Sequence, residues 1–160
     1  MSARDPDSDV RAVVQEAARL LALRATPESE QVVMKLLGDP RRGVREAMVA
    51  ALLDARREAA IPLVLRCLGE RRSEGQLLLE GLLESELDGL DVRGKIVSVL
   101  IDTDNRNEML GALSAIGWLA PSGGFPGSPA AIARVQSLSE SPEDAVRILA
   151  QAALTALGVH

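Results

Sequence analysis

Apolar residues along this 160-residue chain recur with the 3.6-residue period of amphipathic helices. Residues 27–37 are an example, with apolar side chains at Val32, Val33 and Leu36 on one helical face. Such segments are short and alternate with turns rich in Pro, Gly, Asp and Ser. The pattern predicts about nine helices, in four antiparallel pairs with a ninth, unpaired helix near residues 142–157.

The helical pattern itself repeats along the chain. Residues 39–52 and 141–154 each contain a turn, a Val-Arg pair, and an Ala-Leu pair seven residues after the Val. Weaker copies begin near Val10, Gln76 and Arg106. Stacked helix pairs of this kind bury a continuous core that no pair can bury alone. We therefore expect a single domain over residues 1–160, with repeats at approximately 8–38, 39–70, 73–102, 105–140 and 141–158 and a loop insertion at 121–128.

The ends of the predicted helices carry residues that cap helices. Asn, Asp and Ser suit the N-cap, Pro suits the first turn, and Gly suits the C-terminal end. The expected starts are Asp39-Pro40, Ser128-Pro129 and Ser141-Pro142, and the expected stops are Gly38, Gly69, Gly117 and Gly158.

Composition supports an all-α fold. Hydrophobic residues make up 47% of the chain, and Leu and Ala, both strong helix formers, supply most of them. Trp118 and Phe125 are the only aromatic residues, whereas β-sheets are enriched in aromatic and β-branched side chains.

The repeated motif resembles a known family. Asp-Pro, Val-Arg and Ala-Leu within residues 39–52, then Ala-Ile-Pro-Leu at 60–63 and Leu-Gly-Glu at 68–70, resemble HEAT repeats. They are most similar to the short bacterial type grouped with phycobilin-lyase HEAT-like repeats. The resemblance implies a right-handed α-solenoid of about four and a half helix pairs, with first helices convex and second helices concave. It implies a binding scaffold and no single activity.

Few residues suited to catalysis are present. The one His is the last residue, His160, and the one Cys is Cys67. A His-Cys metal cluster is therefore excluded, and a Ser-His-Asp or Cys-His site would need the terminal His160 as its base. We expect no enzyme activity, cofactor or metal. Cys67 stands among apolar residues, which predicts a buried, inert thiol. A single Cys fits a reducing, cytoplasmic compartment, and neither a signal peptide nor a membrane-spanning run is evident.

Charge is unevenly distributed. The net charge of −5 disfavours nucleic-acid binding, which depends on Lys and Arg. Residues 41–72, however, hold eight Arg against four acids, whereas residues 73–108 hold nine acids against three basic residues. The doublets Arg41-Arg42 and Arg71-Arg72 predict a basic edge that steers an acidic partner. The alternative is local pairing of these arginines with acids of the same turns.

Two further sets of polar residues recur at repeat spacing. Arg11, Arg45 and Arg147 follow the repeated Val, and they either form a ladder for an anionic partner or stabilise the stacking by pairing with turn aspartates. Lys35 and Arg66 occupy equivalent positions of the second helices. Ser98 and Gln136 continue this series, which we interpret either as a partner-binding ridge or as an ordinary solvent-facing side.

The 121–128 insertion contains Phe125 and closely follows Trp118. Insertions in solenoids often form binding loops, so both aromatic residues are candidates for partner contact. The alternative is that Phe125 folds back onto Trp118.

The last predicted helix has a polar stripe of Glu143, Arg147 and Gln151, and the rest of its surface is mostly apolar. That apolar surface predicts a homodimer through the C-terminal helix.

The leading hypothesis is a non-enzymatic protein-protein interaction module, an adaptor or scaffold that binds another protein through the solenoid surface. One alternative is a phycobilin-lyase-like enzyme or enzyme subunit that handles a chromophore. The second is a DNA-binding or glycosylase-like HEAT protein, which the acidic net charge and scarce aromatics disfavour.

Overall fold

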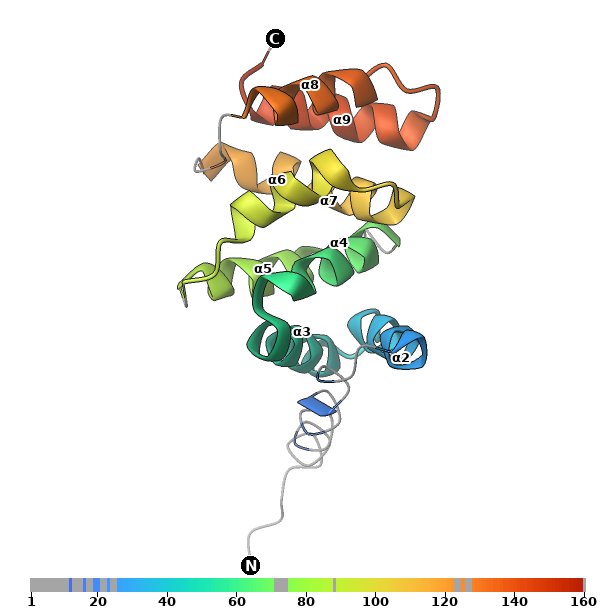
Figure 1. Cartoon of the computed structure of the whole chain (residues 1–160), viewed down its shortest axis with the longest axis vertical. Helices are drawn as coiled ribbons and strands as arrows, with labels where there is room; N and C mark the ends of the chain where they lie inside the picture. Colours follow the sequence, from blue (N-terminus) through green and yellow to red (C-terminus); the bar gives the residue numbers. More distant parts are fainter. Residues whose placement is uncertain are drawn as a thin grey trace, which may run out of the picture.

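A computed structural model describes residues 26–70, 75–87, 89–122, 125 and 128–159, and five single positions before them. All regular structure in these residues is helical (Figure 1). The helices are α2 (Pro27–Leu37), α3 (Arg42–Arg56), α4 (Ile61–Glu70), α5 (Gly75–Leu87), α6 (Val92–Asp102), α7 (Arg106–Leu119), α8 (Pro129–Leu138) and α9 (Asp144–Ala156), with short 3₁₀ turns η1 (Arg57–Ala60) and η3 (Ala120–Ser122).

The helices stack into an elongated α-solenoid, which confirms the predicted fold class (Figure 1). The eight helices coincide with the last eight of the predicted nine, and the first predicted helix lies outside the described residues. Second helices pack in series, α2 on α4, α4 on α6 and α6 on α8. Among first helices, α3 packs on α5 and α7 packs on α9.

One interface departs from simple pairwise stacking. The most extensive contact in the described chain joins α4, a second helix, to α7, the first helix of a later pair. Two glycines allow it. A Cβ atom at Gly111 of α7 would overlap the carbonyl of Leu65, and one at Gly69 of α4 would overlap the carbonyl of Asn107. The backbones of α4 and α7 therefore touch, which explains why glycine stands at both positions.

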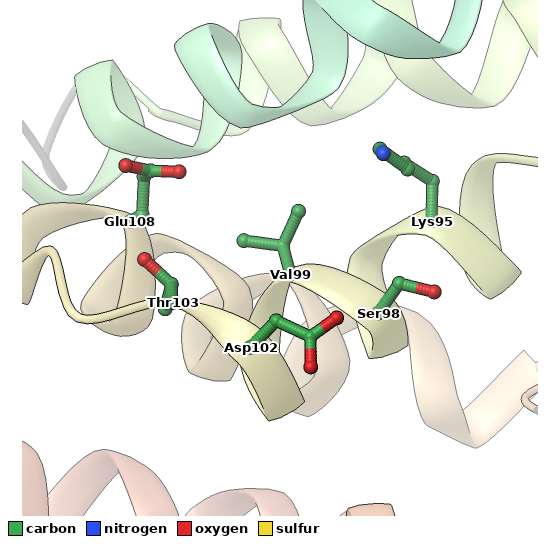
Figure 2. A pocket seen from close by; sticks show the side chains of 6 residues that line it. All are labelled: Lys95, Ser98, Val99, Asp102, Thr103 and Glu108. Atoms are coloured by element: carbon green, nitrogen blue, oxygen red, sulfur yellow. The ribbon is translucent and has the colours of Figure 1, made fainter.

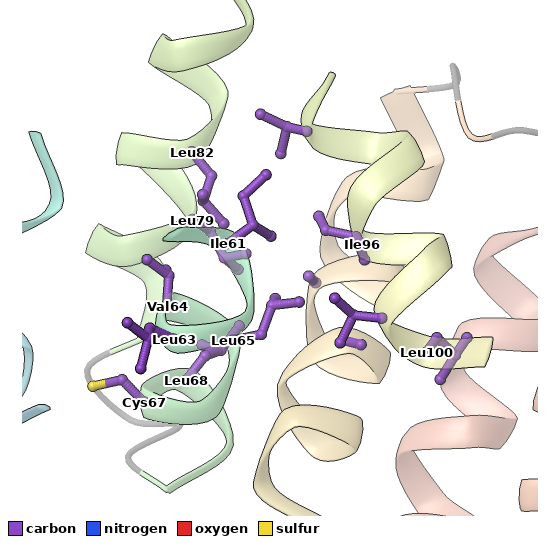
Figure 3. Packing of buried hydrophobic residues seen from close by; sticks show 14 of the residues in the cluster. Ile61, Leu63, Val64, Leu65, Cys67, Leu68, Leu79, Leu82, Ile96 and Leu100 are labelled. Carbon is purple, nitrogen blue, oxygen red and sulfur yellow. The ribbon is translucent and has the colours of Figure 1, made fainter. Parts of the chain in front are cut away.

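A continuous apolar core runs from α2 to α9. Figure 3 shows side chains of α4, α5 and α6 meeting in it, among them Ile61, Leu82 and Ile96, all fully buried. Cys67 is 1% exposed within the same core, as predicted. None of the described helices combines the length and apolarity that crossing a membrane requires.

The predicted helix starts are partly wrong. Ser128 caps α8 as expected, accepting a hydrogen bond from the Ala131 N–H at 3.3 Å. The N-caps of α3 and α9 are instead Arg41 and Glu143. The expected caps lie two residues earlier in each case and close a tight turn before the helix. Asp39 accepts from the Arg41 N–H at 2.8 Å, and Ser141 accepts from the Glu143 N–H at 3.2 Å.

Two of the predicted helix stops are also wrong. Gly38 is the C-cap of α2, and Gly158 follows α9 with a φ of 77°, a conformation that favours glycine. Gly69 and Gly117, in contrast, lie inside α4 and α7. Gly69 is required by the close approach of α7, a tertiary reason that sequence spacing does not reveal.

The glycine contact generates a stability prediction with a control in the same helix. We expect Gly111→Ala to lower the free energy of unfolding by about 1–3 kcal/mol, because the new methyl group meets rigid backbone. Gly117→Ala meets no atom within 4 Å and should leave stability unchanged or raise it by up to about 1 kcal/mol, since alanine favours helix. Urea denaturation followed by circular dichroism measures both. Equal effects of the two substitutions would refute the backbone contact.

Candidate functional site

The predicted ridge residues lie on the second helices. Lys35 on α2, Ser98 on α6 and Gln136 on α8 are exposed, whereas Arg66 on α4 is half-buried. Because second helices pack in series, these positions form a row across the stack. That this row binds a partner stays a prediction.

An open pocket of about 260 Å³ lies at the centre of this row, on α6 and the start of α7 (Figure 2). Ser98 is the ridge residue that lines it. The other lining residues were not predicted as site residues from the sequence, although Lys95 and Asp102 have the helical spacing that places them on the same face as Ser98. The lining residues are Lys95, Ser98, Val99, Asp102, Thr103 and Glu108.

The α6 part of the pocket carries two charges that are not paired with any residue that the structure describes. Neither the Lys95 ammonium nor the Asp102 carboxylate forms an ion pair with any described residue. Ser98 lies between them along the helix, and Val99 supplies an apolar floor (Figure 2). The Thr103 hydroxyl accepts a hydrogen bond from the Asn105 N–H at 3.0 Å. The pocket thus offers a cation, an anion and a hydroxyl to a ligand.

The α7 side of the pocket is occupied by an ion pair. Arg66 Nη2 lies 3.1 Å from Glu108 Oε2, and these side chains are 31% and 14% exposed. Arg66 Nε is buried without a hydrogen-bond partner. Next to this pair, the Asn107 side-chain amide donates to Glu70 at 3.2 Å. Both interactions link α4 to the first turn of α7, so Arg66 contributes to the close helix contact as well as bordering the pocket.

The described part of the basic edge, Arg41 and Arg42, is paired within the chain. Arg41 Nε lies 3.0 Å from Asp39, and Arg42 Nε lies 2.6 Å from Glu46, with Glu80 at 4.0 Å from the same guanidinium. The hydrogen bond from Arg41 lowers the pKa of the Asp39 carboxyl. This is the local pairing considered as the alternative, although both arginine side chains remain about two-thirds exposed. Arg71 and Arg72 lie outside the described residues.

The arginines that follow the repeated Val make the same contact in two repeats. Arg45 Nη1 donates to the Asp39 carbonyl at 2.6 Å, and Arg147 Nη1 donates to the Ser141 carbonyl at 3.3 Å, each six residues back. Arg147 also pairs with Asp144. Among the described residues, these contacts join each guanidinium group to the turn of its own repeat. Arg11 lies outside the described residues.

The two aromatic residues have different environments. Phe125 is half-buried against the core, and the Arg93 guanidinium lies 5.2 Å from its ring centroid. Arg93 Nη1 also donates to the Leu119 carbonyl at 3.2 Å. Phe125 therefore anchors its loop to α6. Trp118 is 43% exposed on α7 and remains a candidate for partner contact.

The outer face of α9 is more polar than the corresponding face of α3. Val49 and Leu53 of α3 are buried, and the equivalent positions of α9 hold the exposed residues Gln151 and Thr155. This face also carries one of the exposed large apolar side chains, Ile148, which is 59% exposed. The homodimer through α9 stays a prediction.

The ion pair at the pocket edge can be tested by a double-mutant cycle. Arg66→Ala, Glu108→Ala and the double variant should give a coupling of about 1 kcal/mol or more, because both groups are largely shielded from water. The control pair, Arg42 and Glu46, is mostly exposed and should give about 0.5 kcal/mol or less. Thermal or urea unfolding provides the free energies. Coupling no larger than the control would contradict the assigned role of Arg66.

The lowered pKa of Asp39 predicts a pH dependence. In the folded state this pKa lies below its ordinary value near 3.9, so the stabilisation is complete above about pH 4 and is lost as pH falls through the folded-state pKa. Asp39→Asn should therefore destabilise the protein at pH 7, by at most about 1 kcal/mol given the exposure of Arg41, and the difference should shrink toward pH 2.5. Asp54→Asn, which removes an exposed carboxylate of α3, is the control. A pH-independent difference would refute this interpretation.

Comparison with known proteins supports the architecture. No curated protein matches the chain. The family model for HEAT repeats matches residues 2–82, just over half of the chain. Together with the stacked helix pairs, this match shows that the chain belongs to the HEAT-repeat family.

Proposed function

We propose that this chain is a non-enzymatic protein-protein interaction module, an adaptor or scaffold, that binds its partner along the second-helix face. HEAT-type solenoids expose extended surfaces, and binding through them is their usual role. The observation that carries the proposal is the pocket at Ser98, where Lys95 and Asp102 have no ion-pair partner among the described residues.

The other predicted surfaces are less available for binding. Arg41 and Arg42 of the basic edge already contact acids of their own chain, and the Arg93 guanidinium lies over the Phe125 ring. An acidic partner at Arg41 and Arg42 would have to displace Asp39 and Glu46, which reduces the gain from each new ion pair. The second-helix face requires no such exchange at Lys95 and Asp102.

Site-specific photo-cross-linking tests the proposal. A benzophenone amino acid placed at Ser98 should form adducts with another protein in the native cells, because Ser98 is exposed beside the pocket. The matched control is Ala50, which is exposed on α3, a first helix. Adducts at Ala50 without adducts at Ser98, or no adducts at either position, would refute binding through the second-helix face.

The same method discriminates the remaining predicted surfaces. A probe at Arg42 reports on the basic edge, and one at Trp118 reports on the aromatic candidates. A probe at Ile148 reports on the homodimer, for which the adduct would have twice the mass of the chain. Light scattering over a range of concentrations provides an independent measure of that association.

A further inference from the structure

The charges on α6 specify the kind of partner that fits the pocket. Lys95 and Asp102 are seven residues apart, which is two helical turns or about 10.5 Å along the helix axis. Both side chains line the same pocket, so they face one ligand. Ser98 and Val99 lie between them and contribute no charge (Figure 2). The surface therefore presents a cation and an anion at a fixed separation with a small uncharged centre.

Neighbouring groups do not neutralise these charges. Glu108, the other carboxylate of the pocket, is held by Arg66 at 3.1 Å, and Glu70 accepts from Asn107. Arg134 on α8 donates to the Leu100 and Thr103 carbonyls at the end of α6. Each of these groups is engaged by the fold. Because no described residue forms an ion pair with Lys95 or Asp102, these two groups can interact with a partner protein or with water.

We propose that the pocket binds an α-helical segment of a partner protein that carries an acidic and a basic residue seven positions apart. A helix lying along α6 matches the separation directly, because both helices have the same rise per residue. Its acid pairs with Lys95 and its base pairs with Asp102, and a small or apolar residue between them packs over Val99. The pair of charges also sets the direction in which the helix binds, since the reverse direction places like charges together. This inference rests on the proposed function and adds the chemistry of the partner.

Selection from a peptide library tests this proposal. The library consists of displayed helical peptides in which two positions seven residues apart are varied among Glu, Lys and Ala. Wild-type protein should enrich peptides with one acid and one base, in either order, over peptides with two like charges or none, because a helix can bind in either direction. The variant Lys95→Glu presents two acids, so it should enrich peptides with two bases, and it should bind the peptides preferred by the wild type at least about tenfold more weakly. Higher salt should weaken both complexes, because exposed charges are screened.

A charge exchange on another helix serves as the control. Arg42→Glu/Glu46→Arg exchanges an exposed pair on α3, and it should leave peptide affinity and charge preference unchanged. Circular dichroism melting establishes that each variant is folded. The neutral variant Lys95→Gln/Asp102→Asn should lose the preference for peptides with opposite charges, which keeps the test decisive if the Lys95→Glu variant is unstable.

The outcomes separate this inference from the proposed function. Binding that is insensitive to substitution at 95 and 102, or enrichment with no preference for opposite charges, overturns the helix proposal. If Ser98 still cross-links to a protein in that case, binding through the second-helix face stands. Absence of cross-links at Ser98 overturns the proposed function and the helix proposal together.

Discussion

The backbone contact between α4 and α7 is the interaction on which the arrangement of the described helices depends. Gly69 and Gly111 permit it, and the pairs Arg66–Glu108 and Asn107–Glu70 lie along its polar edge. Helices that touch at backbone distance gain dispersion contacts along their length and leave no space for an intervening side chain. The remaining helices are arranged around this contact, with α5 against α3, α9 against α7, and α6 between α4 and α8.

Five arginines of the described chain stabilise turns, helix ends and one helix interface. Arg45, Arg93, Arg134 and Arg147 each donate to a backbone carbonyl, and Arg106 pairs with Glu143 across the α7–α9 interface. A half-buried guanidinium is suited to this role because its planar donors can reach carbonyls at turns and helix ends. In the arginine-rich first half, Arg42, Arg45 and Arg66 are likewise engaged within the fold. The surface that we propose for partner binding lies instead on α6, where Lys95 and Asp102 form no ion pair with any described residue.

Some features of the site could be predicted from the sequence and others could not. Repeat spacing placed Ser98 in line with Lys35 and Arg66, and the structure puts the pocket at Ser98. The spacing gave no reason to expect that Glu108, from the start of α7, would join the pocket and bind Arg66, because these residues are 42 positions apart and belong to different repeats. Similarly, Gly69 had the spacing of a helix stop, and only the position of α7 shows that it is a contact glycine.

By itself the sequence determined the all-α fold, the positions of the eight described helices and the repeat that relates them, because helical periodicity and turn residues are local properties of the chain. The tertiary structure decided which helix packs on which, which arginines are engaged and which charges remain open to a partner. Those outcomes depend on close approach between distant segments, and a backbone contact such as that of Leu65 with Gly111 leaves no periodic pattern in the sequence.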